Sequence, residues 1–388
     1  MKNTNALENK VNRFFLNKNA PRQDLGILIL VSILGIFGTL TVFSAGSAYA
    51  EFRYGDPMFF VKRQALWVLI GFTTMFFASR IKPQVYFSLT PYLYAITLCL
   101  LILVLAIGLV GNGAQRWISI GGLTIQPSEI AKMTIVMALS YYFTKNGERA
   151  LGASDKKTKF LAGTLLPCII LAVPIILVML QKHLSCIIIL GIIGLLVIVA
   201  SGTDTRYLTF FCIIGLICVS AIALFTDYTK ERITVWRDPE AYKLTGGWQT
   251  LQGLMAIGSG GAFGVGYGNS LLKYCYVSEP ANDMIYAILA EELGFFGAVC
   301  VLVLFAILVF RGYKLALRAE NIFERLVIFG VFTKIATQTL LNVAVVTNSI
   351  PNTGISLPFF SYGGSSLVML FFEMGIILSV SRYSRISK

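Results

Sequence analysis

The chain has 388 residues, of which 56% are hydrophobic and 13% charged, and its formal net charge is +13. A mean hydropathy of +0.75 excludes a soluble globular protein of this size. The basic excess does not predict a nucleic-acid partner, because no soluble basic domain is present to bind one.

Apolar runs of about 18 or more residues with few charges predict membrane-spanning helices. The expected fold class is all-α: a polytopic membrane protein with about ten transmembrane helices and long ordered extracytoplasmic loops. Residues 1–24 form a polar N-terminal tail without a cleavable signal peptide, residues 25–381 form the transmembrane domain, and residues 382–388 form a short tail. The ten runs are, roughly, 25–45, 64–79, 85–109, 127–143, 160–180, 184–200, 207–226, 283–310, 326–347 and 365–381.

The distribution of Lys and Arg between the expected loops predicts the orientation. If the N-terminus lies inside, the inner segments hold about twice as many Lys and Arg residues as the outer ones. Inner loops carry this excess, so both termini are expected in the cytoplasm. The net charge then reflects topology and contact with anionic membrane lipids. The seven cysteines lie mostly in or beside apolar runs, without a CxxC pair, and are expected to be packing residues.

Two expected outer segments, 226–283 and 347–365, are too long and too structured to be simple connectors. The second, with its flanks, reads TNSIPNTGISLPFFSYGGSS, which combines Gly, Pro and Ser with Phe and Tyr. Irregular backbone at membrane depth is stable only where protein buries it or a watery cavity solvates it. The sequence therefore predicts a cavity that opens outward and is covered by these two segments.

Ionisable residues inside the expected helices are candidates to line this cavity. Glu129 and Lys132, in QPSEIAK at 126–132, are three residues apart on one helix face and can pair. This pair is either functional or a neutralised structural pair. Lys334 and Glu373 are isolated charges that we expect to have structural partners.

The glycine-rich segment GSGGAFGVGYGNS at 258–270 has two interpretations. It follows no strand and no βαβ unit, so its context excludes a dinucleotide-binding fold. The glycines either allow tight backbone packing or offer N–H groups, together with Lys273, to a phosphate.

Four carboxylates fall within VSEPANDMIYAILAEELGFFG at 277–297, next to an apolar run. Glu291 and Glu292 lie two turns into the expected helix and are expected to be structural, with buried polar partners. Asp283 stands where loop becomes helix. From the residues alone it is either a helix cap or a functional acid whose pKa responds to burial.

Five segments of the chain form a recognisable set. They are RW at 116–117, QPSEIAK at 126–132, GGAFGVGYGNSLLK at 260–273, SEPANDMIYAILAEELGFFG at 278–297 and PNTGISLPFFSYGGSS at 351–366. Together they resemble the SEDS family, which comprises RodA, FtsW and SpoVE, and the GNSxxK form at 268–273 is closer to the FtsW and SpoVE branch. The resemblance implies a peptidoglycan glycosyltransferase of the bacterial cytoplasmic membrane that polymerises lipid II, an undecaprenyl-pyrophosphate-linked glycan. It also implies a class B penicillin-binding protein transpeptidase as partner.

Within the resemblance, the essential acid of the family aligns with Asp283, which implies a general base. Glu279 is expected to tune the site or to hold a divalent cation such as Mg or Mn. The residues expected to bind substrate or line the cavity are Arg116, Glu129, Lys132, His183, Lys273, Glu279, Ser361, Tyr362, Ser365 and Ser366.

One segment departs from the family pattern. Where the family usually reads QPDLGT, this chain reads QKHLSC at 181–186, so that His183 replaces the acid. This puts in doubt a cation held between that position and Asp283.

Two other functions stay open. A lipid II flippase or another lipid-linked-sugar translocase fits the same pattern, and a non-catalytic scaffold of a cell-wall synthesis complex fits if the departure abolishes activity.

Overall fold

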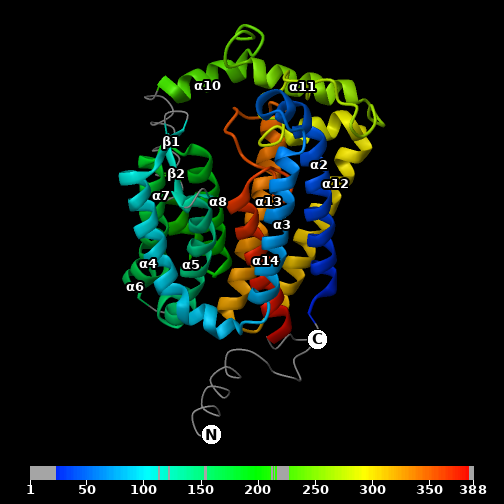
Figure 1. The fold of residues 1–388 in the computed structure, drawn as a ribbon. Helices are drawn as coiled ribbons and strands as arrows, with labels where there is room; N and C mark the ends of the chain where they lie inside the picture. Colours follow the sequence, from blue (N-terminus) through cyan, green and yellow to red (C-terminus); the bar gives the residue numbers. More distant parts are fainter. Residues whose placement is uncertain are drawn as a thin grey trace.

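The computed structural model describes residues 23–111, 114–120, 123–152, 155–210, 213, 215 and 227–383. Figure 1 shows long helices running side by side, with two short helices across one end of the bundle. The helices are α2 (Leu25–Tyr54), α3 (Phe59–Ala78), α4 (Pro83–Ile107), α5 (Pro127–Leu151), α6 (Lys156–Thr158), the π-helix η1 (Lys159–Leu165), α7 (Leu166–Leu180), α8 (Leu184–Ala200), α10 (Asp227–Arg237), α11 (Trp248–Gly260), α12 (Ile285–Arg318), α13 (Ile322–Val346) and α14 (Gly364–Tyr383).

The long helices form two groups that meet at α5 and α13. Helices α4, α5, α7 and α8 pack together on one side, and α2, α3, α12, α13 and α14 on the other (Figure 1). Helix α13 contacts α5, α8 and α12, so it joins the groups. The α10–α11 end of the bundle lies opposite the end where α2 begins and α14 finishes. At the latter end the Asp24 N–H donates to Ser381 Oγ at 3.2 Å.

The helices confirm the expected all-α membrane fold. Among the described residues, six helices are long and apolar enough to cross a membrane: 25–54, 83–107, 156–180, 285–318, 322–346 and 364–383. The expected spans at 64–79, 127–143 and 184–200 also coincide with helices. Most of the expected span at 207–226 and most of the tail at 1–24 lie outside the described residues, and residues 384–388 lie wholly outside them.

A small antiparallel sheet between α4 and α5 was not expected. It consists of β1 (Leu109–Gly111), β2 (Ala114–Ile120) and β3 (Leu123–Ile125), in the order β1-β2-β3. Trp117 pairs with Leu109, and Ile118 with Ile125. Strands of three to seven residues give too short an alternation to stand out beside apolar runs of membrane length. Strand β2 carries Arg116, so the sheet positions a candidate site residue.

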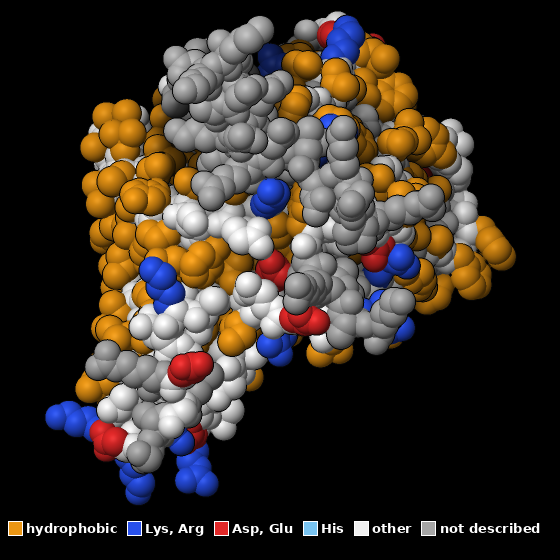
Figure 2. Space-filling model, turned by 90° about the horizontal axis from the view of Figure 1, so that it is seen from below, with side chains coloured by type: hydrophobic (Ala, Val, Ile, Leu, Met, Phe, Trp, Pro, Cys, Tyr) orange, Lys and Arg blue, Asp and Glu red, His pale blue; other side chains and the backbone are white. Residues whose placement is uncertain are grey.

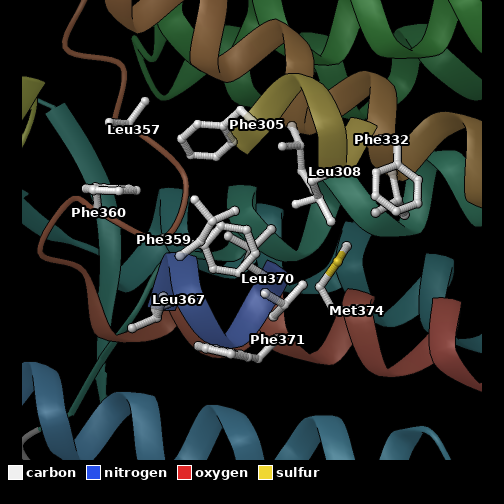
Figure 3. Close-up of a cluster of buried hydrophobic side chains, with 14 of the residues drawn as sticks. Phe305, Leu308, Phe332, Leu357, Phe359, Phe360, Leu367, Leu370, Phe371 and Met374 are labelled. Atoms are coloured by element: carbon white, nitrogen blue, oxygen red, sulfur yellow. The ribbon is translucent and has the colours of Figure 1, made fainter. Parts of the chain in front are cut away.

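The segment LPFFSY at 357–362 lies inside the protein and not on its surface. Leu357, Phe359 and Phe360 are almost fully buried. Figure 3 shows their side chains among Phe305 of α12 and Phe371 of α14, within one buried cluster. Burying a large apolar side chain contributes about 1.5–3 kcal/mol. The apolar residues therefore anchor a segment that has no regular secondary structure of its own, as the sequence led us to expect.

The glycine-rich segment packs its backbone against a break in α12. Gly294 interrupts that helix with φ +67° and ψ −172°. On either side of the break, the Val265 N–H donates to Glu291 O and the Phe295 N–H donates to Gly261 O. A Cβ added at Gly264 would lie 2.2 Å from the Glu292 carbonyl oxygen. The tight-packing interpretation of the glycines is therefore confirmed, and several of the N–H groups proposed for a phosphate are already bonded.

Hydrophobic side chains cover the flanks of the bundle, as expected of a surface in contact with lipid. Exposed examples are Leu69 of α3, Ile96 of α4, Ile169 of α7 and Val303 of α12. Figure 2 views the end where α2 begins and shows Lys and Arg side chains projecting beside the hydrophobic surface. Near the start of α2, Arg311 of α12 pairs with Asp24 at 2.7 Å.

Candidate active site

A cavity of about 710 Å³ lies close to the α10–α11 end of the bundle. Side chains from both helix groups and from the sheet line it. They comprise Arg63, Leu66 and Trp67 of α3, Arg116 and Trp117 of β2, Thr124 of β3, Gln126, Glu129 of α5, His183, Glu279, Asn282, Asp283, Ser356, Tyr362 and Ser366, with glycines at 354, 363 and 364.

Asp283 is a partly buried carboxylate on the wall of this cavity, one residue before the N-cap of α12. Its backbone is fixed from α13, because Asn342 donates its side-chain amide to the Asp283 carbonyl at 2.8 Å. Gln249 of α11 donates to both carboxylate oxygens at 3.4 Å. The N-cap of α12 is Met284, and no side chain makes a capping hydrogen bond there. The helix-cap interpretation of Asp283 is therefore wrong.

The pKa of Asp283 is raised to about 6. Burial is the main cause, because it disfavours the charged form, and the negative charge of Glu279 adds to it. Hydrogen bonds from its own N–H, from Gln249 and from the Met284 N–H oppose the shift. A carboxylate with this pKa is mostly ionised at neutral pH and still basic enough to accept a proton.

Glu279 lies on the same wall, in a strained loop. It adopts φ +54°, a left-handed conformation that is uncommon for a residue with a side chain. Its carboxylate accepts a hydrogen bond from the Asn282 side-chain amide, and its carbonyl accepts from the Asn282 N–H at 3.0 Å. Backbone strain of this kind often accompanies functional sites. Here it holds a second carboxylate beside Asp283.

Two arginines add positive charge to the cavity. Arg63 of α3 lies 4.1 Å from the ring centroid of Phe59. Arg116 donates to the Lys182 carbonyl, while its Nε has no hydrogen-bond partner among the described residues. A guanidinium with spare donors suits a phosphate group, which it can bind with two hydrogen bonds. The cavity therefore combines carboxylates and cations on one surface.

Glu129 and Lys132 form the expected pair, but only Glu129 reaches the cavity. Their side chains are 2.7 Å apart, and Lys132 is buried beneath the wall. The expectation that Lys132 lines the cavity is corrected accordingly. Lys334 of α13 and Glu373 of α14 pair with each other, as their isolation in the sequence led us to expect. Removing one partner from such a buried pair is costly, because it leaves an uncompensated buried charge. The Glu129–Lys132 pair lies within α5, whereas the Lys334–Glu373 pair joins α13 to α14.

The polar residues of PNTGISLPFFSYGGSS at 351–366 lie partly on the cavity wall and partly in the interior of the protein. Tyr362 and Ser366 line the cavity. Ser361 is buried and donates to the Asn282 carbonyl at 2.7 Å, which fixes the loop beside Asp283. It lines a narrow extension below the cavity, and Ser365 is not among the lining residues of any described pocket. Ser361 therefore supports the loop beside Asp283, and the expectation that Ser365 lines the cavity is corrected.

Lys273 lies away from the cavity, which corrects the expectation of a phosphate contact. Its ammonium is buried and pairs with Glu292 at 3.2 Å, and it also donates to Ser44 Oγ at 3.4 Å. Glu291 accepts from Ser270 Oγ at 2.5 Å and from the Leu271 N–H at 2.9 Å. Both acids of α12 thus have the buried polar partners that the sequence led us to expect.

His183, in the segment QKHLSC that departs from the family pattern, is a neutral residue on the cavity wall. Burial lowers the pKa of His183 to about 3, and the charges of Arg116 and Lys132 add to this shift. His183 Nδ1 lies 3.4 Å from Ser128 Oγ and 3.5 Å from Gln126 Nε2. His183 therefore carries no charge at neutral pH, and the cavity has a neutral imidazole at the position where the family usually has an acid.

Glu279 and Asp283 are the acids of the cavity that could bind a divalent cation, because the third acid, Glu129, is paired with Lys132. Among the described residues, no group of three or more His, Cys, Asp and Glu side chains is arranged to hold a metal ion. Mg²⁺ is often bound by one or two carboxylates, with water and substrate phosphates as further ligands. The pair fits a cation of this kind, which would supply positive charge next to a phosphate.

The residues that the sequence left unnoticed are mainly those that hold Asp283. Gln249 lies 34 positions before Asp283 and Asn342 lies 59 after it. Neither stands in a charged motif, so no pattern in the sequence distinguishes them from other polar residues. Arg63 stands between Lys62 and Gln64 near the start of α3, so the sequence around it gives no signal that distinguishes it from an ordinary charge beside a membrane span.

The fold and the cavity define a multi-pass membrane protein with a polar, charged site at one end of its helix bundle. The chain belongs to the FtsW/RodA/SpoVE family, described as "Cell cycle protein", which matches residues 24–386. This confirms the resemblance found in the sequence motifs.

The relatives and solved structures agree along nearly the whole chain. The chain is 36% identical to Stage V sporulation protein E of Bacillus subtilis, with 95% of this chain and 99% of the relative covered. It is 33% identical to the probable peptidoglycan glycosyltransferase FtsW of Geobacter sulfurreducens (strain DL-1 / KN400), and the alignment covers 94% of this chain and 96% of that relative. Among solved structures, a chain from a study of the structural coordination of polymerization and crosslinking by a peptidoglycan synthase complex aligns with a TM-score of 0.76 and 26% identity, covering 92% of this chain and 97% of that chain. RodA of Thermus thermophilus aligns with a TM-score of 0.68 and 26% identity, covering 92% of this chain and 96% of RodA.

Proposed function

We propose that this chain is a peptidoglycan glycosyltransferase that polymerises lipid II into glycan strands, with Asp283 as the general base. The observation that carries the proposal is the position of Asp283. It lies on the cavity wall with a pKa of about 6, next to Glu279 and in the same cavity as Arg63 and Arg116. The names of the FtsW relatives and of the aligned synthase complex support the same activity.

The residues match the needs of glycosyl transfer from a pyrophosphate-linked sugar. A hydroxyl oxygen of the incoming sugar bonds to the anomeric carbon of the donor, and the bond from that carbon to the pyrophosphate oxygen breaks. Asp283 accepts the proton of the attacking hydroxyl. Arg63 and Arg116 stabilise the negative charge that leaves with the pyrophosphate.

The direction of the site across the membrane follows from the distribution of charge. We place the α10–α11 end at the outer face of the bacterial cytoplasmic membrane and both termini in the cytoplasm. The excess of Lys and Arg in the opposite loops supports this orientation. Membrane lipids then surround the apolar flanks.

Cys275 offers a test of this orientation, because it is an exposed native thiol between α11 and α12. A membrane-impermeant thiol reagent should label it in intact cells, and the matched Cys275→Ser variant should lose the signal. Labelling that requires the reagent on the cytoplasmic side would reverse the topology.

Polymer formation is the direct test of the activity. The purified protein is given labelled lipid II, alone and with a class B penicillin-binding protein transpeptidase as the proposed partner. We expect lipid-linked glycan strands. If the protein instead only moves lipid II between the leaflets of vesicles, the flippase alternative holds, and if it does neither, the scaffold alternative holds.

A further inference from the structure

Asp283 lies at the junction of the large cavity and a second, smaller chamber. The second chamber measures about 240 Å³ and shares Arg116, Glu279, Asp283 and Gly354 with the large cavity. A third chamber of about 250 Å³ continues from it below α10 and α11 and shares Arg232, Gln249 and Asn352. Asp283 therefore lines two adjoining spaces.

Both sides combine charged and neutral polar groups. The large cavity holds Arg63 and Arg116, which suit a pyrophosphate. The smaller chambers share Arg116 with it and add Arg232 and Glu231, together with the amide and hydroxyl groups of Gln249, Thr250 and Thr353. They also hold the indole ring of Trp236. Amides and hydroxyls match the hydroxyl and acetamido groups of a sugar, and an aromatic ring matches its apolar face.

The walls of the small chambers are held in place by the second outer segment. Trp236 of α10 donates its indole N–H to the Asn348 carbonyl at 2.9 Å. Arg232 of the same helix donates to the Asn352 carbonyl. These hydrogen bonds hold α10 over the chambers, so residues from both expected outer segments, 226–283 and 347–365, line them.

Thr353 has hydrogen-bonding capacity that the protein leaves unused. Its Oγ1 is buried and has no hydrogen-bond partner among the described residues. A buried hydroxyl without a partner costs free energy that a ligand can recover. This group lies on the wall of the chamber that borders Asp283.

We infer that the two small chambers form a carbohydrate subsite that holds sugars of the growing glycan strand beneath α10 and α11. The inference rests on the proposed polymerase function. Each chamber is smaller than the range of roughly 300–1,000 Å³ typical of pockets for drug-sized ligands, which suits about one sugar ring. The strand would lie on one side of Asp283, and the pyrophosphate-linked end would lie in the large cavity.

Strand length tests this subsite separately from the transfer reaction. Thr353→Val keeps the shape of the side chain and removes only the unpartnered hydroxyl, so the fold is retained. Weaker retention of the strand releases it earlier, and the mean strand length should fall about two- to tenfold, the range for one hydrogen bond. The matched control is Thr234→Val on the exposed side of α10, which should make strands of unchanged length.

A second measurement does not depend on turnover. Amide hydrogen exchange is followed across 230–237 and 248–260 with a lipid-free tetrasaccharide of alternating N-acetylglucosamine and N-acetylmuramic acid as probe. We expect slower exchange in both helices with the unsubstituted protein and less protection with Thr353→Val. Unchanged strand length in Thr353→Val, or no protection by the tetrasaccharide, overturns the subsite. A protein that is protected by the tetrasaccharide but makes no polymer instead overturns the proposed function.

Discussion

Gln249 of α11 donates its side-chain amide to both carboxylate oxygens of Asp283, at 3.4 Å each. This contact links a helix that lies across one end of the bundle to the acid on the cavity wall. It also lowers the pKa of Asp283, against the effects of burial and of Glu279. Gln249 is therefore a positioning residue for the proposed base.

Replacing Gln249 should move the pH dependence of polymerisation. Gln249→Leu removes the donor that favours the carboxylate form, so the pKa of Asp283 should rise by up to about one unit, the scale of one modest hydrogen bond. Gln249→Glu places another negative charge beside Asp283 and should shift the pKa further. The measurement is kcat against pH for the three proteins. An unshifted acid limb in both variants would show that the contact does not tune the base.

The unsubstituted protein should lose activity on the acid side of about pH 6. The active form of a base is deprotonated, and burial followed by Glu279 raises the pKa of Asp283 to about 6. Polymerisation should therefore be nearly constant above about pH 7 and fall about tenfold per unit well below pH 6.

His183 provides the control for this profile. Its pKa is lowered to about 3, so it does not titrate in the measured range. His183→Asn should keep the midpoint of the acid limb. A midpoint that disappears in His183→Asn would assign the titration to the imidazole and not to Asp283.

The buried pair of Lys273 and Glu292 should matter for stability. Lys273→Met leaves the Glu292 carboxylate buried without its cation, which typically costs about 3–5 kcal/mol. Lys62→Met, which breaks the exposed pair with Asp56, should have little effect. Thermal unfolding in detergent measures both. A fully stable Lys273→Met variant with impaired substrate binding would restore the phosphate contact suggested by the sequence.

The sequence predicted the long helices well, because length and hydropathy define a membrane span without reference to the rest of the fold. Helices α10 and α11 were expected only as an ordered loop, since helices of 11 and 13 residues fall below the length of a span. Lys273 was misjudged for a different reason. The glycines before it, such as Gly268, suggested a phosphate loop, whereas its partner Glu292 lies in a helix 19 positions later.

The glycine segment allows a comparison of two matched substitutions. Gly264 and Gly268 have φ of +81° and +83°, so an alanine at either position is strained by about 1–2 kcal/mol. A Cβ at Gly268 meets nothing within 4 Å, whereas one at Gly264 would lie 2.2 Å from the Glu292 carbonyl. Gly264→Ala should therefore lower the melting temperature clearly more than Gly268→Ala. Equal losses would mean that the segment does not pack tightly against the break in α12.

The most direct test of the central claim is the rate of lipid II polymerisation by Asp283→Asn. Asparagine keeps the size of the side chain, so insertion, folding and partner binding should be retained, and Glu291→Gln serves as a control that should lower stability more than turnover. If Asp283 is the general base, the rate should fall about 10²-fold or more, the usual scale for losing a positioned base. Normal polymer synthesis by Asp283→Asn at normal expression would contradict the account.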